Sequence, residues 1–186
     1  MTAAAKLVVM AGPSAVGKGT LATFVVTHFP NFALSISATT RSPRQGEVEG
    51  ESYFFISEEE FEDRVNAGQM LEWAKVHGKH SYGTPRAAVE RALAQGKHVI
   101  LEIDVQGAFQ VRSSFPDAVL IFVNPPSFEE LKARLDKRGT ESEQDKQIRL
   151  ETARTELLLA KEFDFSVIND EVARCAQEVV DLVQST

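Results

Sequence analysis

A segment suited to holding phosphates lies near the start of the chain, between residues 12 and 20. It reads Gly-Pro-Ser-Ala-Val-Gly-Lys-Gly-Thr and fits the pattern G-x-x-x-x-G-K. Its glycines let the backbone bend so that successive N–H groups face a polyphosphate, and its lysine adds a positive charge. The segment predicts a site for a nucleoside triphosphate, held by Gly12, Pro13, Ser14, Ala15, Val16, Gly17, Lys18, Gly19 and Thr20.

One position in this loop departs from the usual pattern. Gly19 stands where Ser or Thr is common, and the hydroxyl comes one residue later, at Thr20. The hydroxyl that usually ligates Mg²⁺ is therefore absent. We expect Mg²⁺ to accompany the nucleoside triphosphate and to be held largely by phosphate oxygens and water, since this ion gives up its water reluctantly. Thr20 is the candidate protein contact within the loop.

Two carboxylates follow a second apolar segment, Val99–Leu101. Glu102 and Asp104 are two residues apart, so on a strand they share one face. An α/β sheet places its ligand site at the carboxyl ends of its strands. The alternative is a pair of solvent-exposed acids at a strand end.

A third segment, residues 35–47, is rich in hydroxyls and carries Arg41 and Arg44 on either side of Ser-Pro. Arginine matches phosphate oxygens with two parallel hydrogen bonds, so this turn could hold a second phosphate group. Residues 71–73 and 81–85 are polar and aromatic, and each alone could equally be a surface loop.

Three further arginines fall in a charged region late in the chain. Arg134 and Arg138 are four residues apart on one predicted helical face, and Arg149 belongs to the next helix. Such residues usually form a solvated helix face. Transfer of a phosphoryl group needs nearby cations to neutralise it, which favours a catalytic interpretation.

The elements that would position these residues alternate between strands and helices. Such alternation predicts a parallel α/β sheet. Capping boxes at Ser57–Glu60 and Ser127–Glu130 mark helix starts, and Pro85 and Gly96 suit the two ends of another helix. The strand candidates are residues 6–10, 33–37, 98–103, 118–123 and 165–168.

Two regions interrupt the alternation and predict mobile appendages on a single domain. Residues 37–84 indicate a small inserted α+β lobe, and residues 129–155 a helical hairpin. The core would comprise residues 1–36, 85–128 and 156–186. Two appendages on one core suit closure over a phosphoryl transfer.

The composition of the chain argues against several classes of protein. The chain has 186 residues and a formal net charge of −7, which argues against general nucleic-acid binding. Its longest apolar run, residues 118–123, is too short to span a bilayer. A single cysteine, Cys175, fits a reducing compartment and is interpreted as structural. The start of the chain has no apolar signal core, so we expect a cytoplasmic protein.

With these segments in view, the chain resembles the guanylate kinases from about Leu7 to Asn169. The loop is shared by many nucleotide-binding proteins, whereas the Thr-Thr-Arg and Glu-Ile-Asp segments are highly specific. The resemblance is carried by residues 12–18, 37–47, 53–55, 72–74, 82–84, 101–107, 138–141 and 168–170.

The resemblance implies a P-loop NTPase core with a parallel sheet flanked by helices, a GMP-binding lobe over 37–84 and a helical lid over 129–155. It implies that the γ-phosphoryl group of ATP passes directly to GMP, giving ADP and GDP. It assigns the GMP phosphate to Ser37, Arg41, Arg44, Tyr53 and Tyr82, and the guanine to Glu72, Thr84 and Asp104. Arg41, Arg138 and Arg149 would surround the phosphoryl group, with Arg134 nearby. Asn169 would lie near the adenine of ATP. Glu47 would orient the cations of the site, and Glu102 would order the water around Mg²⁺.

The guanine assignment also has a physical basis. Guanine offers N1–H and N2–H₂ donors on the edge where adenine mainly accepts, and a carboxylate only accepts. Glu72 and Asp104 would be left unsatisfied by adenine, which is how a site rejects an analogue strongly.

Ala15 occupies a loop position that is often glycine in the family. We expect its methyl group to be tolerated only if the residue keeps a negative φ.

Two other functions stay open at this point. Guanylate-kinase-like domains also serve as peptide-binding scaffolds, although these typically lack the loop lysine or the arginines. A kinase for another nucleotide or small phosphate acceptor is the second alternative. The use of dGMP and the choice between monomer and homo-oligomer are also open.

Overall fold

The core of the molecule is a five-stranded, fully parallel sheet. The computed structural model describes residues 4–76, 80–137 and 143–186. The strand order is β2-β7-β1-β8-β9, which confirms the predicted parallel α/β class. The core strands are β1 (Leu7–Ala11), β2 (Phe32–Leu34), β7 (His98–Glu102), β8 (Val119–Asn124) and β9 (Phe165–Ile168).

Helices cover both faces of this sheet, which explains why its strands are continuously apolar. Alternate residues of β1 enter different clusters: Val8 and Met10 pack against α1 and α7, while Leu7 and Val9 pack against α3 and α4. These helices are α1 (Lys18–His28), α3 (Arg86–Ala94), α4 (Val105–Ser114) and α7 (Val172–Ser185). Cys175 is buried on α7, and burial raises the pKa of its thiol to about 11, which fits the predicted structural role.

Residues between β2 and α3 form the small lobe. Its four-stranded sheet has the order β4-β3-β6-β5, and Phe61 of α2 packs on it with Ala38 and Met70. The Ser57 hydroxyl accepts a hydrogen bond from the Glu60 N–H at 3.1 Å, as the capping box predicts. The elements are β3 (Ala38–Thr39), β4 (Phe54–Phe55), α2 (Glu58–Asn66), β5 (Met70–Val76) and β6 (His80–Pro85).

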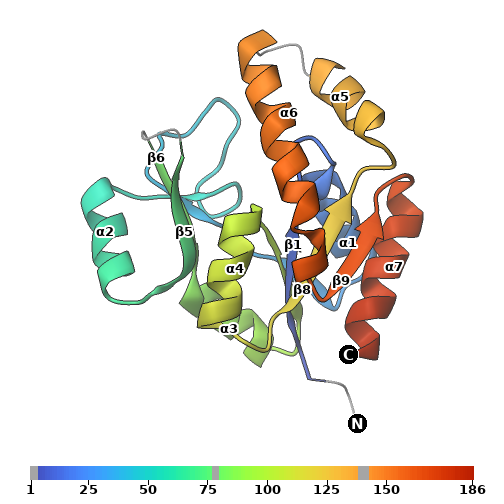
Figure 1. Cartoon of the computed structure of the whole chain (residues 1–186). Coiled ribbons are helices and arrows are strands. Elements are labelled where there is room, and N and C mark those ends of the chain that lie inside the picture. Colours follow the sequence, from blue (N-terminus) through green and yellow to red (C-terminus); the bar gives the residue numbers. More distant parts are fainter. Residues whose placement is uncertain (1–3, 77–79, 138–142) are drawn as a thin grey trace.

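Helices α5 (Phe128–Lys137) and α6 (Glu143–Leu158) form the helical hairpin, followed by a short 3₁₀ helix, Ala160–Glu162. The small lobe stands to one side of the core and this hairpin above it, while the C-terminus lies at the opposite end (Figure 1). Lys146 of α6 pairs with Asp136 of α5 at 3.3 Å, and the Arg154 guanidinium lies 4.8 Å from the centre of the Phe128 ring. These contacts hold the two helices together.

Several predicted boundaries shift slightly, as in the following two cases. The strand expected over 33–37 ends at Leu34, because the chain leaves the core sheet there to enter the lobe. Pro85 is the last residue of β6 and precedes α3 rather than lying in its first turn. In the described part of the chain, no helix combines the length and apolar character needed to cross a membrane.

Candidate active site

The phosphate-binding loop connects β1 to α1, as predicted. Gly12 has φ 150° and Gly17, the N-cap of α1, has φ 96°, both in the region that favours glycine. A Cβ atom at Gly12 would collide with the Val123 carbonyl oxygen of β8. The first glycine therefore permits a close approach of the loop to the sheet as well as the bend.

The expectation for Ala15 is wrong. Ala15 has φ 65°, and it is the one non-glycine residue with positive φ among the described residues. An L-residue in this left-handed region brings its Cβ close to the following carbonyl, which costs about 1–2 kcal/mol. The methyl group is partly buried against the core cluster of α1 and α7, and this packing offsets part of the strain.

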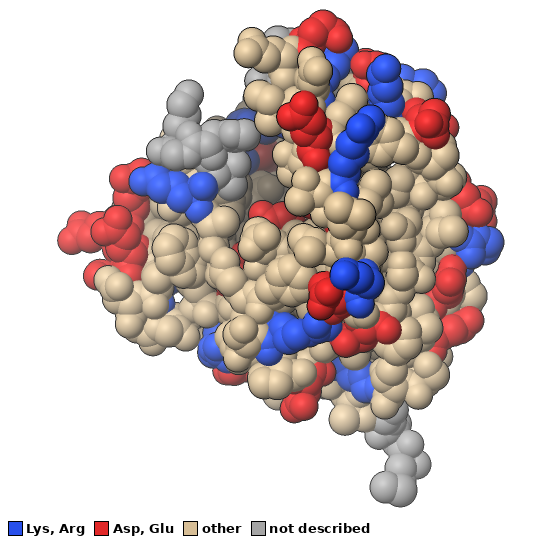
Figure 2. Space-filling model, in the orientation of Figure 1, with Lys and Arg blue, Asp and Glu red and all other residues tan. Residues whose placement is uncertain are grey.

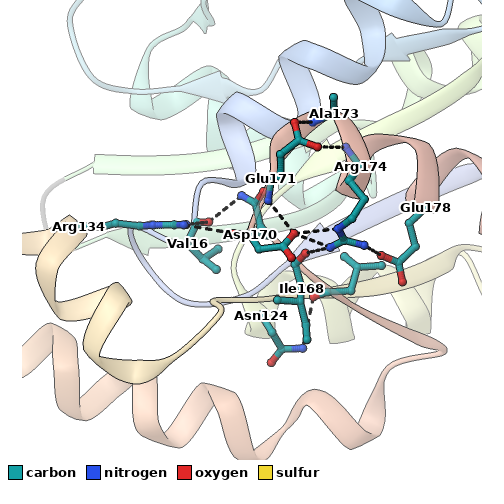
Figure 3. A network of polar contacts seen from close by, with 11 residues as sticks. Val16, Asn124, Arg134, Ile168, Asp170, Glu171, Ala173, Arg174 and Glu178 are labelled. Carbon is teal, nitrogen blue, oxygen red and sulfur yellow. Dashed lines mark hydrogen bonds and ion pairs between the residues drawn. The ribbon is translucent and has the colours of Figure 1, made fainter.

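The loop is held from outside by two polar side chains that meet at the Val16 carbonyl oxygen. It accepts from Asn169 Nδ2 at 2.9 Å and from Arg134 Nη1 at 3.0 Å, and Arg134 Nη2 donates to the Asn169 carbonyl at 3.2 Å. Figure 3 shows this junction beside the turn into α7, where Arg174 bonds to Asp170 and Glu178. Arg134 and Asn169 thus fix the shape of the loop.

Lys18 lies on the inner side of the same loop. Its ammonium group donates to the carbonyl oxygens of Gly12 at 2.6 Å and Pro13 at 3.2 Å. The lysine is therefore positioned at the place where the loop would enclose phosphates.

The carboxylates lie beside this loop because β1 and β7 are neighbours. Met10 pairs with Glu102, so both strands reach their carboxyl ends together. A Cβ atom at Gly19 would lie 3.1 Å from Glu102 Oε2, which places the Glu102 carboxylate against the residue that lacks the usual hydroxyl. Asp104 is the N-cap of α4, and its Oδ1 accepts from the Gly107 N–H at 2.7 Å.

A cavity of about 490 Å³ opens between the loop, the end of β7 and α6. Arg149 of α6 lines it and donates to the Ser14 hydroxyl of the loop at 2.9 Å. The space-filling view shows a hollow between the small lobe and α6 on the face it presents (Figure 2). The lining residues are Gly12, Ser14, Lys18, Glu102, Ile103, Asp104, Ile148, Arg149, Thr152 and Glu156.

Glu156 was not predicted as a site residue. Burial raises the pKa of its carboxyl group, while the charge of Lys18 acts in the opposite direction. It lies seven residues after Arg149, two helical turns further along the same face. Helical spacing from Arg149 was the sequence signal that could have indicated it.

A second polar cluster, in the small lobe, surrounds Arg41. Glu47 binds its guanidinium with two hydrogen bonds, of 2.9 and 2.8 Å, and Tyr82 accepts from its Nε at 3.2 Å. The Tyr53 ring lies 5.4 Å from the guanidinium carbon. The bond from Arg41, together with one from the Arg44 N–H, lowers the pKa of Glu47 to about 2, so this carboxylate stays ionised and holds Arg41 in place.

A third group, which lies where the lobe meets the core, centres on Glu72 of β5. Its side chain is buried, and Oε1 accepts from the Thr84 hydroxyl at 2.7 Å. Burial raises the pKa of Glu72 to about 7, although the Thr84 bond opposes this shift and the nearby Asp104 charge adds to it.

The structure thus brings the predicted residues into three groups. Lys18, Glu102, Asp104 and Arg149 share the cavity, while Arg41, Glu47, Tyr53 and Tyr82 form the lobe cluster. Ser37 precedes β3 of the lobe, and Arg44 is exposed. Arg138 lies outside the described residues.

A phosphate-binding loop on a parallel α/β sheet, with a separate arginine cluster in an inserted lobe, defines a P-loop nucleotide kinase. The family model for guanylate kinase matches residues 4–186. The guanylate kinase of Leifsonia xyli subsp. xyli is 54% identical over 177 residues, covering 95% of this chain and 70% of that protein. The guanylate kinase of Nocardia farcinica is 50% identical over 182 residues, covering 97% of this chain and 94% of that protein.

A solved structure agrees. The crystal structure of guanylate kinase from Anaplasma phagocytophilum matches with a TM-score of 0.76 and 30% identity, covering 98% of this chain and 86% of that one. The chain belongs to the guanylate kinase family, and its activity is ATP:GMP phosphotransfer.

Proposed function

We propose that the γ-phosphoryl group passes from ATP to GMP in one in-line step, with ATP on the loop and GMP between the lobe and the core. The observation that carries this proposal is the shared cavity, which Lys18 enters from the loop, Arg149 from α6 and Asp104 from the end of β7. The acceptor is itself an ionised phosphate, so no strong general base is needed. Positioning and cationic stabilisation then supply most of the rate enhancement.

The phosphate of GMP would bind at the lobe cluster. Arg41 is held by Glu47 and Tyr82 in a fixed orientation, which reduces the entropy lost when it binds an anion. Ser37, Arg44 and Tyr53 complete this proposed subsite. Glu47 acts here on Arg41 rather than on the nucleotide.

The guanine base would bind at Glu72, Thr84 and Asp104. Thr84 donates to Oε1 of Glu72, which fixes the carboxylate and leaves Oε2 to face the helix α4 side. Guanine presents two donors to this acceptor-rich group, and adenine does not.

The transferring phosphoryl group would lie among Lys18, Arg41, Arg138 and Arg149. Lys18 is already at the loop, and Arg149 is already bonded to Ser14 of that loop. Arg134 would act through the Val16 and Asn169 carbonyls that it binds, and Asn169 would border the adenine site from the same place.

Mg²⁺ fits this donor set only when phosphates are present. Among the described residues, no three His, Cys, Asp or Glu side chains come together as a metal site. The Glu102 carboxylate beside Gly19 is an oxygen donor suited to Mg²⁺ or to its bound water, and Thr20 is the nearby hydroxyl. When bound with ATP, the ion would neutralise charge on the phosphates.

The proposal also extends to the partners of the protein and to its location in the cell. A net charge of −7 and interspersed acidic and basic side chains (Figure 2) favour small nucleotides over nucleic acid or membrane as partners. We propose a cytoplasmic enzyme that closes its lobe (37–84) and lid (129–155) over the core.

An acceptor screen tests the function. ADP production from ATP is measured with GMP, dGMP, AMP, UMP and CMP. The proposal predicts strong ADP production with GMP, whereas a peptide-binding scaffold would produce none, and a kinase for another nucleotide would prefer a different acceptor.

A further inference from the structure

Gly107 occupies a crowded position in the first turn of α4. It is buried, and its N–H is bonded to the Asp104 carboxylate. A Cβ atom at Gly107 would lie 3.1 Å from Glu72 Oε2, 3.2 Å from Ile103 Cδ1 and 3.3 Å from Asp104 Oδ1. All three distances are tighter than ordinary van der Waals contact, and two of them are to carboxylate oxygens.

The backbone gives no reason for glycine at this position. Gly107 is absent from the glycines with positive φ in the described chain, and it lies within a regular helix. Glycine is a poor helix former, so alanine would favour this helix if there were room. What the glycine provides is space for the two carboxylates.

The Glu72 backbone cannot shift freely to accommodate an added methyl group. Strand β5 is the edge of the lobe sheet, and α4 binds it on both sides of residue 72. The Ser114 hydroxyl donates to the Leu71 carbonyl at 2.7 Å. The Gln110 amide accepts from the Trp73 N–H at 3.1 Å and donates to the Trp73 carbonyl at 3.0 Å. Because Leu71 and Trp73 are both hydrogen-bonded to α4, the Glu72 carboxylate itself would have to move.

We propose that Gly107 is a positioning residue for guanine selection: because it has no side chain, the Glu72 and Asp104 carboxylates can converge on the first turn of α4. This inference rests on the proposed role of these carboxylates in reading guanine. The helix N-terminus adds a favourable positive potential for both of them. Gly107 itself need not contact the nucleotide.

The test is Gly107→Ala with Ser113→Ala as the matched control. Ser113 lies on the exposed side of the same helix, and its hydroxyl bonds only to the Phe109 carbonyl among the contacts described. Steady-state kinetics with GMP, AMP and ATP are measured for both. We expect the KM for GMP to rise by about tenfold or more in Gly107→Ala, because a carboxylate is misplaced. The KM for ATP should stay within about twofold, a split that general destabilisation would not produce.

A double-mutant cycle shows whether Gly107 acts through Glu72. In a Glu72→Ala background, Gly107→Ala should raise the KM for GMP by clearly less than it does alone, since the nearest of the three groups around the added methyl group is gone and only Ile103 and Asp104 remain. If Gly107→Ala alone does not fold, the double variant should fold, because the tightest of the three contacts has been removed.

The outcomes are distinct. If Gly107→Ala behaves like Ser113→Ala, or if its effect on the KM for GMP is undiminished in the Glu72→Ala background, or if the double variant fails to fold, the inference about Gly107 is wrong. If Glu72→Ala by itself leaves the KM for GMP and the selectivity over AMP unchanged, the proposed base-reading function is wrong instead.

Discussion

At this site, the space and charge of neighbouring groups determine which residue fits at each position. Gly12 allows the loop to approach β8, and Gly19 and Gly107 each leave room for a carboxylate. The sequence suggests phosphate-binding roles for Lys18 and Arg41, because their residue types suit that chemistry, and these roles stay predictions. The φ of Ala15 could not be predicted, because it follows from how the whole loop wraps between β1 and α1.

Replacing Ala15 by glycine should stabilise the protein. Glycine relieves the left-handed strain, and this gain exceeds the extra entropy of the unfolded chain, so the free energy of unfolding should rise by about 0.5–1 kcal/mol. The measurement is urea unfolding. Ala87→Gly, at an exposed helical position of α3, is the control and should lower stability by a similar amount. A loss of stability in Ala15→Gly would show that the packing of the methyl group outweighs the strain.

The raised pKa of Glu72 predicts a pH dependence of stability. Its folded-state pKa of about 7 lies above the ordinary value of 4.5, so the folded protein holds this proton more tightly than the unfolded chain does. The contribution to stability is complete below pH about 4.5 and is lost as the pH rises through about 7. Asp104, the charged neighbour, acts in the same direction.

Glu72→Gln removes this titration. The free energy of unfolding of the variant, relative to the unmodified protein, should therefore rise between about pH 5 and pH 8, by up to about 2–3 kcal/mol. Urea unfolding at several pH values measures it. A difference that is constant across this range would contradict the burial argument.

At the scale of elements, helices α4 and α6 bring together residues that lie far apart in the sequence. The sequence predicted the core strands because uninterrupted apolar runs are typical of a sheet buried on both faces. It could not predict that Gln110 and Ser114 of α4 would bind the edge of β5, because exposed polar helix residues have many possible partners. Glu156, which α6 brings into the cavity with Arg149, was missed, although its helical spacing from Arg149 could have indicated it.

The bond between α4 and β5 predicts that Gln110→Ala weakens GMP binding from a distance. Two side-chain-to-backbone hydrogen bonds are lost, which should cost about 1 kcal/mol of stability at this exposed site. The KM for GMP should rise several-fold with the KM for ATP unchanged. Trp73 is the single tryptophan of the chain and is 44% exposed, so its fluorescence reports this contact directly. If fluorescence and GMP binding both match those of Ser113→Ala, the hydrogen bonds between Gln110 and the Trp73 backbone do not contribute to GMP binding.

At the scale of the whole molecule, the α5–α6 hairpin lies above the core and the small lobe lies to one side of it (Figure 1). The division into core, lobe and lid remains a prediction from the sequence. The hydrogen bonds between α4 and β5 indicate that the Glu72 end of the lobe stays with the core. Any closure would then bring the Arg41 end toward the loop.

Closure predicts a more compact molecule when both substrates are bound. A domain of this length has an expected radius of gyration of about 16 Å, and closure of two appendages should reduce it by roughly 1 Å. Small-angle X-ray scattering with GMP and a non-hydrolysable ATP analogue measures the change, with GMP alone as the control. Identical scattering in the free and doubly bound states would argue for a rigid molecule.

The most direct test of the account is the ratio of kcat/KM for GMP to kcat/KM for AMP, measured in the unmodified protein and in Glu72→Ala. Lys18→Ala, which should be inactive with either acceptor, serves as the blank. A site that selects guanine through the buried Glu72 carboxylate should give a ratio of about 10⁴ or more, and Glu72→Ala should lower it by about 100-fold or more. An unchanged ratio in Glu72→Ala would contradict the claim that this buried carboxylate chooses the substrate.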